Sequence, residues 1–178
     1  MRKLLYIFLL FSFWGQAQIC PGEQGKLNYR FWLDLEDSGI SSLLSRNDFP
    51  YSPDSVKTLY RLETPYRYSN FYGGIVEGFI RDTSTRTVRF GVTGDNHVEF
   101  YLSTDDNPEN ASLISYVDNP SGYDNLMDDT TQISENITLQ AGEYYYFKVL
   151  NYDSWGNDYG VVWWEDCLLY TSPSPRDS

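Results

Sequence analysis

The chain has 178 residues, 25 acidic against 13 basic side chains, and a net charge of −12. Such an acidic surface repels phosphate backbones, which argues against a nucleic-acid partner. Its one histidine, His97, leaves little basis for Ser/His/Asp or Cys/His catalysis or for a zinc site with several His ligands. We therefore expect a binding protein rather than an enzyme.

The first 17 residues have the pattern of a cleavable secretory signal. A basic start at residues 1–3 precedes an apolar run from Leu4 to Trp14 and the small residues Gly15 and Ala17. The apolar run is shorter than the roughly 20 residues that a membrane span needs. We expect cleavage after Ala17, a secreted or cell-surface product, and no membrane insertion of the mature chain.

Apolar and polar side chains alternate along much of the remaining chain, with the period of a half-buried strand. The only helix-sized segment is 38–45, a short turn at best. In chain order, strands are predicted at 26–33, 75–81, 88–93, 98–102, 112–117, 131–139, 145–149 and 161–163. Turn residues separate the strands, so residues 18–166 are expected to form one all-β domain, an antiparallel β-sandwich or barrel.

The same alternation predicts which strand faces are buried. At least one of Trp163 and Trp164 should lie in the core, because both belong to a strand. The predicted inward sets are Val88, Phe90 and Val92; Val98, Phe100 and Leu102; Tyr145, Phe147 and Val149; and Val161 with Trp163.

Three predicted loops, at 105–110, 124–129 and 153–158, concentrate carboxylate and amide side chains. Oxygen ligands of this kind suit Ca²⁺. The first loop lacks the glycine and terminal glutamate of an EF-hand, and a solvated acidic loop accounts for each group by residue type alone. By residue type alone we therefore favour solvated acidic loops over a calcium site at each of the three positions.

Aromatic side chains form the second group of candidates. Tyr152 and Trp155 lie with Asn157 and Asp158 in a polar loop, where binding residues concentrate. Flat rings stack on the apolar faces of sugars, and amides or carboxylates hydrogen-bond to hydroxyls. We take these four residues as candidate ligand-binding residues, with packing in the core as the open alternative for Trp155.

Five segments occur in an order that resembles the protective-antigen fourteen-kDa (PA14) domain family, named for an anthrax toxin fragment. They are Leu27–Trp32, Tyr72–Ile80, Val92–Pro108, Thr138–Tyr145 and Gly156–Trp164. The segment from Val92 to Pro108 is similar to a secreted Bacteroidetes-type branch. The resemblance covers residues 25–164 and implies the β-sandwich module found in bacterial toxins, glycosidases and yeast adhesins.

The resemblance also implies a metal-centred sugar site. In the adhesin branch, adjacent aspartates in an acidic turn hold calcium, and the sugar binds through that ion. The aligned pair here is Asp95-Asn96, whose amide oxygen can still coordinate calcium but carries no charge. We expect Asp95, Asn96 and Asp153 to form the metal site and Trp155 to offer a stacking face.

These features predict a secreted carbohydrate-binding or adhesive module from the N-terminal part of a larger bacterial surface protein, with a glycan or cell-surface polysaccharide as its partner. Calcium dependence is what the family resemblance implies. Two alternatives stay open: a structural or protein–protein module, and an accessory domain of a glycoside hydrolase. Residues 167–178 resemble a translated sequencing adapter or a Ser/Pro-rich linker, so we exclude them from the domain.

Overall fold

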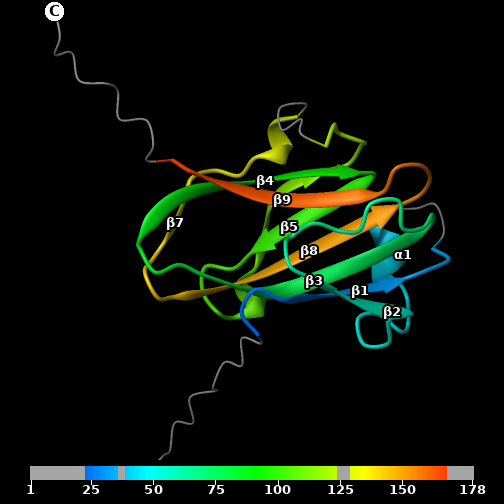
Figure 1. The fold of residues 1–178 in the computed structure, drawn as a ribbon, viewed down its shortest axis with the longest axis horizontal. Coiled ribbons are helices and arrows are strands. Elements are labelled where there is room, and N and C mark those ends of the chain that lie inside the picture. The colour runs from blue at the N-terminus through cyan, green and yellow to red at the C-terminus, as the bar shows by residue number, and fades with distance from the viewer. Residues whose placement is uncertain (1–22, 36–38, 124–128, 168–178) are drawn as a thin grey trace, which may run out of the picture.

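The computed structural model describes residues 23–35, 39–123 and 129–167 (Figure 1). The predicted signal segment, residues 168–178 and most of the acidic group at 124–129 lie outside these ranges. Two antiparallel sheets face each other as the layers of a sandwich, with β4 and β9 above β3 and β8 in Figure 1. The predicted all-β sandwich is confirmed.

The larger sheet has the strand order β2-β1-β3-β8-β5-β6 and the smaller has the order β7-β4-β9. The large-sheet strands are β1 Leu27–Trp32, β2 Ser55–Leu59, β3 Tyr72–Arg81, β5 His97–Leu102, β6 Ser112–Val117 and β8 Tyr144–Asp153. The small-sheet strands are β4 Arg86–Asp95, β7 Ile137–Leu139 and β9 Tyr159–Asp166. Short helices are α1 Ile40–Leu44, η1 Pro108–Asn110 and η2 Thr130–Gln132.

The core between the sheets includes the alternating side chains predicted from β4, β5 and β8, together with buried residues of β1 and β3 such as Tyr29, Phe31 and Val76. Val92, Val98 and Phe100 are fully buried, and Phe90 packs on Phe100 with ring centroids 5.3 Å apart. A second cluster lies where α1 covers one end of the larger sheet, around Trp32 and Leu43. Burial of apolar surface in these clusters is the main favourable contribution to folding.

Three sequence expectations differ from the structure. Strand β2 was not predicted, because it is an edge strand whose residues are mostly exposed. Only Ile137–Leu139 of the segment 131–139 is a strand, since η2 occupies its start. On β9, Val162 packs against the core, whereas Trp163 is half-buried and Trp164 is 45% exposed.

Candidate functional site

Strand ends bring the candidate metal ligands to one end of the sandwich. Asp95 is the last residue of β4, in the smaller sheet, and Asp153 is the last residue of β8, in the larger sheet. The turn after Asp95 leads directly into β5, which pairs with β8 so that His97 faces Tyr152. The β4–β5 turn therefore lies beside the end of β8, as the sandwich topology requires.

Asn96 connects this turn to the loop that follows β8. Its Oδ1 atom accepts hydrogen bonds from the Ser154 backbone N–H at 2.8 Å and from the Ser154 hydroxyl at 3.0 Å. The peptide bond between Asp95 and Asn96 is cis. Asn96 thus fixes the position of the turn relative to Asp153, the residue before Ser154.

Several carboxylate oxygens at this end of the sandwich are buried and accept no hydrogen bond from a described residue. Asp153 is fully buried, and neither of its carboxylate oxygens accepts a hydrogen bond from a described residue; the same is true of Asp95 Oδ1 and Asp158 Oδ1. Burial, followed by the negative charges of Asp158 and Asp95, raises the pKa of Asp153 to about 7. Burial and Asp158 also raise the pKa of Asp95. The site therefore brings together carboxyl groups whose ionisation is opposed by burial and by one another's charge.

Asp158 has a structural role at this end of the sandwich. Its Oδ2 atom accepts hydrogen bonds from the Tyr72 hydroxyl at 2.9 Å and from the backbone N–H groups of Tyr68 and Ser69. The side chain is 1% exposed, so it lies behind the surface where a ligand would bind. Asp158 holds the segment before β3 against the β8–β9 loop.

Tyr152 also lies below the surface. It is 3% exposed and belongs to the cluster that packs under α1. The expectation that Tyr152 and Asp158 touch a ligand directly does not fit this burial, because a buried side chain cannot present a stacking face or a hydroxyl partner without rearrangement. Both residues are placed to support the loops instead.

Trp155 and Asn157 have the exposed positions expected of ligand-binding residues. The Trp155 side chain is 73% exposed, and its ring lies 6.4 Å from that of Phe71. The Asn157 Oδ1 atom accepts a hydrogen bond from Arg67 Nε at 2.7 Å and one from the Tyr66 hydroxyl at 3.3 Å. The β8–β9 loop and the segment before β3 thus form one continuous surface.

The sequence reasoning missed the segment before β3. Backbone hydrogen bonds from Thr64 to Gly160 and from Arg67 to Asp158 attach it to the start of β9 and the residue before it. Tyr66 is 57% exposed there. In the sequence, this segment is marked only by aromatic residues after Pro65. Its role depends on the contact between Arg67 and Asn157, which are about 90 positions apart.

The acidic loop at 105–110 is satisfied by its own hydrogen bonds. Asp105 accepts hydrogen bonds from the Ser103 hydroxyl, the Asn107 backbone N–H and the Asn110 amide. These bonds, with the Asn107 N–H first among them, lower the pKa of Asp105. The loop is an internally bonded turn, in contrast to the carboxylates at the end of β4 and β8.

Comparisons with known proteins come from relatives and from solved structures; no family model matches the chain. The mouse N-acetyl-beta-glucosaminyl-glycoprotein 4-beta-N-acetylgalactosaminyltransferase 1 is 27% identical over 150 residues. That match covers 82% of this chain and 14% of the mouse protein, so the chain spans only a small part of that relative's length.

Two solved structures share the architecture. The Epithelial Adhesin 9 A domain from Candida glabrata, in complex with Galb1-4GlcNAc, has a TM-score of 0.52 at 10% identity over 78% of this chain and 80% of the adhesin chain. A PA14 sugar-binding domain from an RTX adhesin has a TM-score of 0.52 at 10% identity, over 80% of this chain and 90% of its own. The chain has the fold of a PA14 domain. At this level of identity the likeness concerns the fold alone.

Proposed function

We propose that the protein is a glycan-binding module of the PA14 fold that binds sugar with the help of a calcium ion at the end of β4 and β8. The observation that carries the proposal is the pair of aspartates, Asp95 and Asp153, whose buried carboxylate oxygens have no hydrogen-bond donor among the described residues. A buried unpaired charge is costly, and coordination of a metal ion is one of the few ways to offset the cost.

The residue types suit Ca²⁺ better than other ions. Across the described ranges, no three His, Cys, Asp or Glu side chains form a group that could hold a metal ion. The proposed ligand set is two carboxylates, Asp95 and Asp153, completed by main-chain oxygens, which calcium accepts in its flexible coordination sphere; the Asn96 amide oxygen already accepts two hydrogen bonds from Ser154 and positions the turn instead. When bound, the ion would offer open coordination positions to sugar hydroxyls.

Exposed groups beside these aspartates supply the remaining elements of a sugar site. Trp155 presents a largely exposed ring, while Asn157, Tyr66 and Arg67 offer hydrogen-bonding groups on the same surface. A ring for stacking beside a few oriented polar groups is the usual composition of a small-ligand site. The fold likeness to a PA14 sugar-binding domain and to an adhesin domain crystallised with a disaccharide supports this proposal.

The likeness to part of a glycosyltransferase suggests a second kind of parent protein in which the domain could bind glycans. The mouse relative is an enzyme by name, and this chain matches only 14% of it. We propose that the domain recognises glycans without catalysing a reaction, either in a secreted adhesive protein or as the accessory domain of an enzyme. The signal-like pattern at residues 1–17 supports export in both settings.

Thermal unfolding of the full chain in millimolar calcium and in excess chelator tests the metal site. A ligand that binds only the folded state raises the melting temperature, with a stabilisation of about 2.7 kcal/mol at 100-fold excess over Kd. We expect a rise with calcium that Asp95→Ala and Asp153→Asn abolish. Asp105→Asn, in the satisfied acidic loop, is the matched control and should keep the response. Equal melting in calcium and chelator would rule out the proposed ion.

A further inference from the structure

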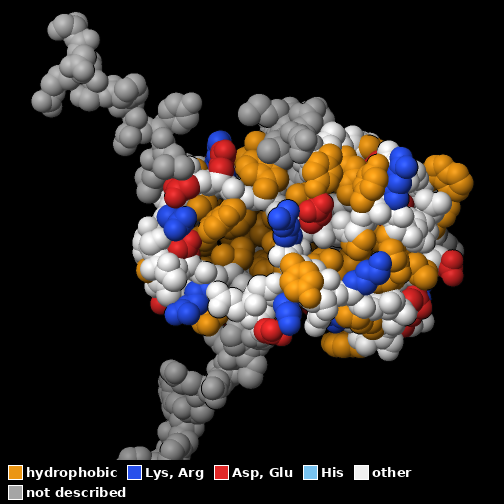
Figure 2. Space-filling model, in the orientation of Figure 1, with side chains coloured by type: hydrophobic (Ala, Val, Ile, Leu, Met, Phe, Trp, Pro, Cys, Tyr) orange, Lys and Arg blue, Asp and Glu red, His pale blue; other side chains and the backbone are white. Residues whose placement is uncertain are grey.

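A cleft opens on the molecule where two neighbouring strands of the larger sheet diverge. Strand β1 pairs with β3 only between Tyr29↔Val76 and Trp32↔Gly73, although β3 continues to Arg81. The cleft beyond the last pair has a volume of about 730 Å³, within the range of roughly 300–1,000 Å³ that is typical of ligand pockets. The space-filling view shows this face hollowed and lined by hydrophobic side chains (Figure 2).

The cleft is separate from the proposed calcium site. Asp153 pairs with Tyr72 at the start of β3, whereas Gly78, which lines the cleft, lies six positions further along that strand. At about 3.3 Å per residue, this separation is roughly 20 Å. A ligand in the cleft would therefore not contact the β4–β5 turn unless it were an extended chain.

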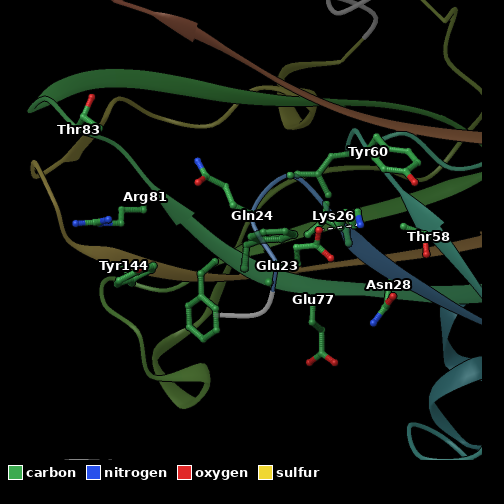
Figure 3. Close-up of a pocket in the computed structure, with 16 residues that line it drawn as sticks. Glu23, Gln24, Lys26, Asn28, Thr58, Tyr60, Glu77, Arg81, Thr83 and Tyr144 are labelled. Carbon is green, nitrogen blue, oxygen red and sulfur yellow. Dashed lines mark ion pairs between the residues drawn. The ribbon is translucent and has the colours of Figure 1, made fainter. Parts of the chain in front are cut away.

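The lining combines an apolar floor with a polar rim. Leu27, Leu62, Gly78 and Phe147 provide apolar surface in the lining, and Phe79 adds an aromatic ring on the other face of β3, against Tyr144 and Tyr146. The rim carries side-chain amides and hydroxyls together with a tyrosine ring that is 73% exposed. The polar lining residues are Gln24, Asn28, Thr58, Tyr60 and Thr83; in Figure 3, Gln24 and Tyr60 lie on one side of β3, whereas Asn28 points to the other side, with Glu77.

The charged groups at the cleft already have partners. Glu23 and Lys26 form an ion pair at 2.8 Å, drawn as a dashed line in Figure 3. Glu77 is paired with Arg30 and also accepts a hydrogen bond from the Tyr146 hydroxyl. Each carboxylate at the cleft therefore has its own cation, and the cleft needs no metal ion to balance its charge.

Arg81 is held in place at the other side of the opening. Its Nε atom donates to the Gly142 carbonyl at 3.0 Å, and its guanidinium lies 5.1 Å from the centre of the Tyr144 ring. By contrast, no hydrogen bond joins the side chains of Gln24, Asn28 or Thr58 to another described residue. The groups at this rim that are open to a ligand are therefore mostly neutral donors and acceptors.

We propose that this cleft is a second, metal-independent saccharide site. A pyranose ring has an apolar face and a rim of hydroxyl groups, which suits a cleft whose lining combines apolar side chains with neutral amides and hydroxyls. The exposed Tyr60 ring provides a stacking surface at the edge. The inference goes beyond the calcium site and does not depend on it, and two sites on one module would raise its avidity for a polysaccharide.

Saturation-transfer NMR of the full chain in excess chelator tests the second site. The probes are lactose, cellotriose, laminaritriose and chitotriose, which present different hexose and N-acetylhexosamine faces. The blocking variant is Gln24→Trp, which fills the exposed rim, and Asn28→Ala removes one amide. The matched control is Ser112→Trp, an exposed position at the start of β6, outside the cleft lining.

We expect at least one probe to bind the unaltered chain and Ser112→Trp equally in chelator. Gln24→Trp should weaken that binding about tenfold or more, equivalent to about 1.4 kcal/mol. Asn28→Ala should weaken it by less, because one neutral hydrogen bond is lost. Asp153→Asn should leave it unchanged. No binding of any probe in chelator, or equal binding by Gln24→Trp, would overturn the inference. Probe binding in chelator by an unaltered chain that shows no response to calcium would instead overturn only the proposed metal site.

Discussion

At the residue scale, Asp153 has an environment that opposes its own ionisation. It is fully buried, faces Asp158 and Asp95, and has a pKa of about 7 against an ordinary value of 3.8. Between these values the folded chain holds a proton on this group that the unfolded chain releases. In the absence of calcium, the free energy of unfolding should therefore fall as the pH rises from about 4 to about 7.

Replacement of Asp153 by asparagine isolates this effect. The amide cannot ionise, so Asp153→Asn should be more stable than the unaltered chain in chelator above about pH 7, and should lose less stability between about pH 4 and pH 7. Urea unfolding at a series of pH values provides the measurement. Parallel pH profiles for the two proteins would show that the fold does not oppose the ionisation of Asp153.

Trp155 is predicted to act on binding and not on stability. Its ring is 73% exposed, so Trp155→Ala should change the free energy of unfolding by no more than about 0.5 kcal/mol. Glycan affinity in calcium should fall about tenfold or more through loss of the stacking face. The control is Trp164→Ala, a partly exposed tryptophan near the opposite end of β9. Unchanged glycan binding by Trp155→Ala would show that this ring does not contact the sugar.

At the element scale, strand alternation predicted the buried faces of β4, β5 and β8, because each side chain there faces either the core or the outside. It failed on β9, where Trp163 lies directly opposite Gly91. A Cβ atom at Gly91 would come within 2.1 Å of the Trp163 ring. That tryptophan therefore packs across the outer surface of β4, a contact between strands about 70 positions apart that local periodicity does not register.

The Gly91–Trp163 contact gives a stability prediction. Gly91→Ala would force the ring of Trp163 to move, so we expect a loss of about 1–3 kcal/mol in the free energy of unfolding. Arg89→Ala on the same strand is the control and should cost no more than about 1 kcal/mol, because the ion pair of Arg89 with Glu165 is exposed. Urea denaturation of both variants provides the comparison. A Gly91→Ala variant as stable as the unaltered chain would mean that the ring has room to shift.

The candidate site was only partly predictable from sequence for the same reason. The aligned turn pointed to Asp95 and Asn96, and loop composition pointed to Trp155 and Asn157. Residue types alone could not show that Tyr152 and Asp158 would be buried, nor that Arg67 would reach Asn157. Those positions depend on how the segment before β3 packs against β9, which is a long-range consequence of the fold.

At the scale of the whole molecule, the sandwich separates two surfaces with different chemistry. One end gathers aspartates whose charges have no partner, in a chain that already carries a net charge of −12. The divergence of β1 and β3 forms a cleft whose carboxylates are each paired with a cation. We therefore propose a cation only at the first surface, where it would offset charge and provide a contact for sugar hydroxyls.

Glycan-array binding by the full chain, measured in millimolar calcium and then in excess chelator, tests the central claim most directly. We expect a set of glycans bound only in calcium, with Asp153→Asn losing that set while remaining folded. Glycan binding that is identical in calcium and chelator, or that Asp153→Asn retains in full, would contradict a calcium-centred site at the end of β4 and β8.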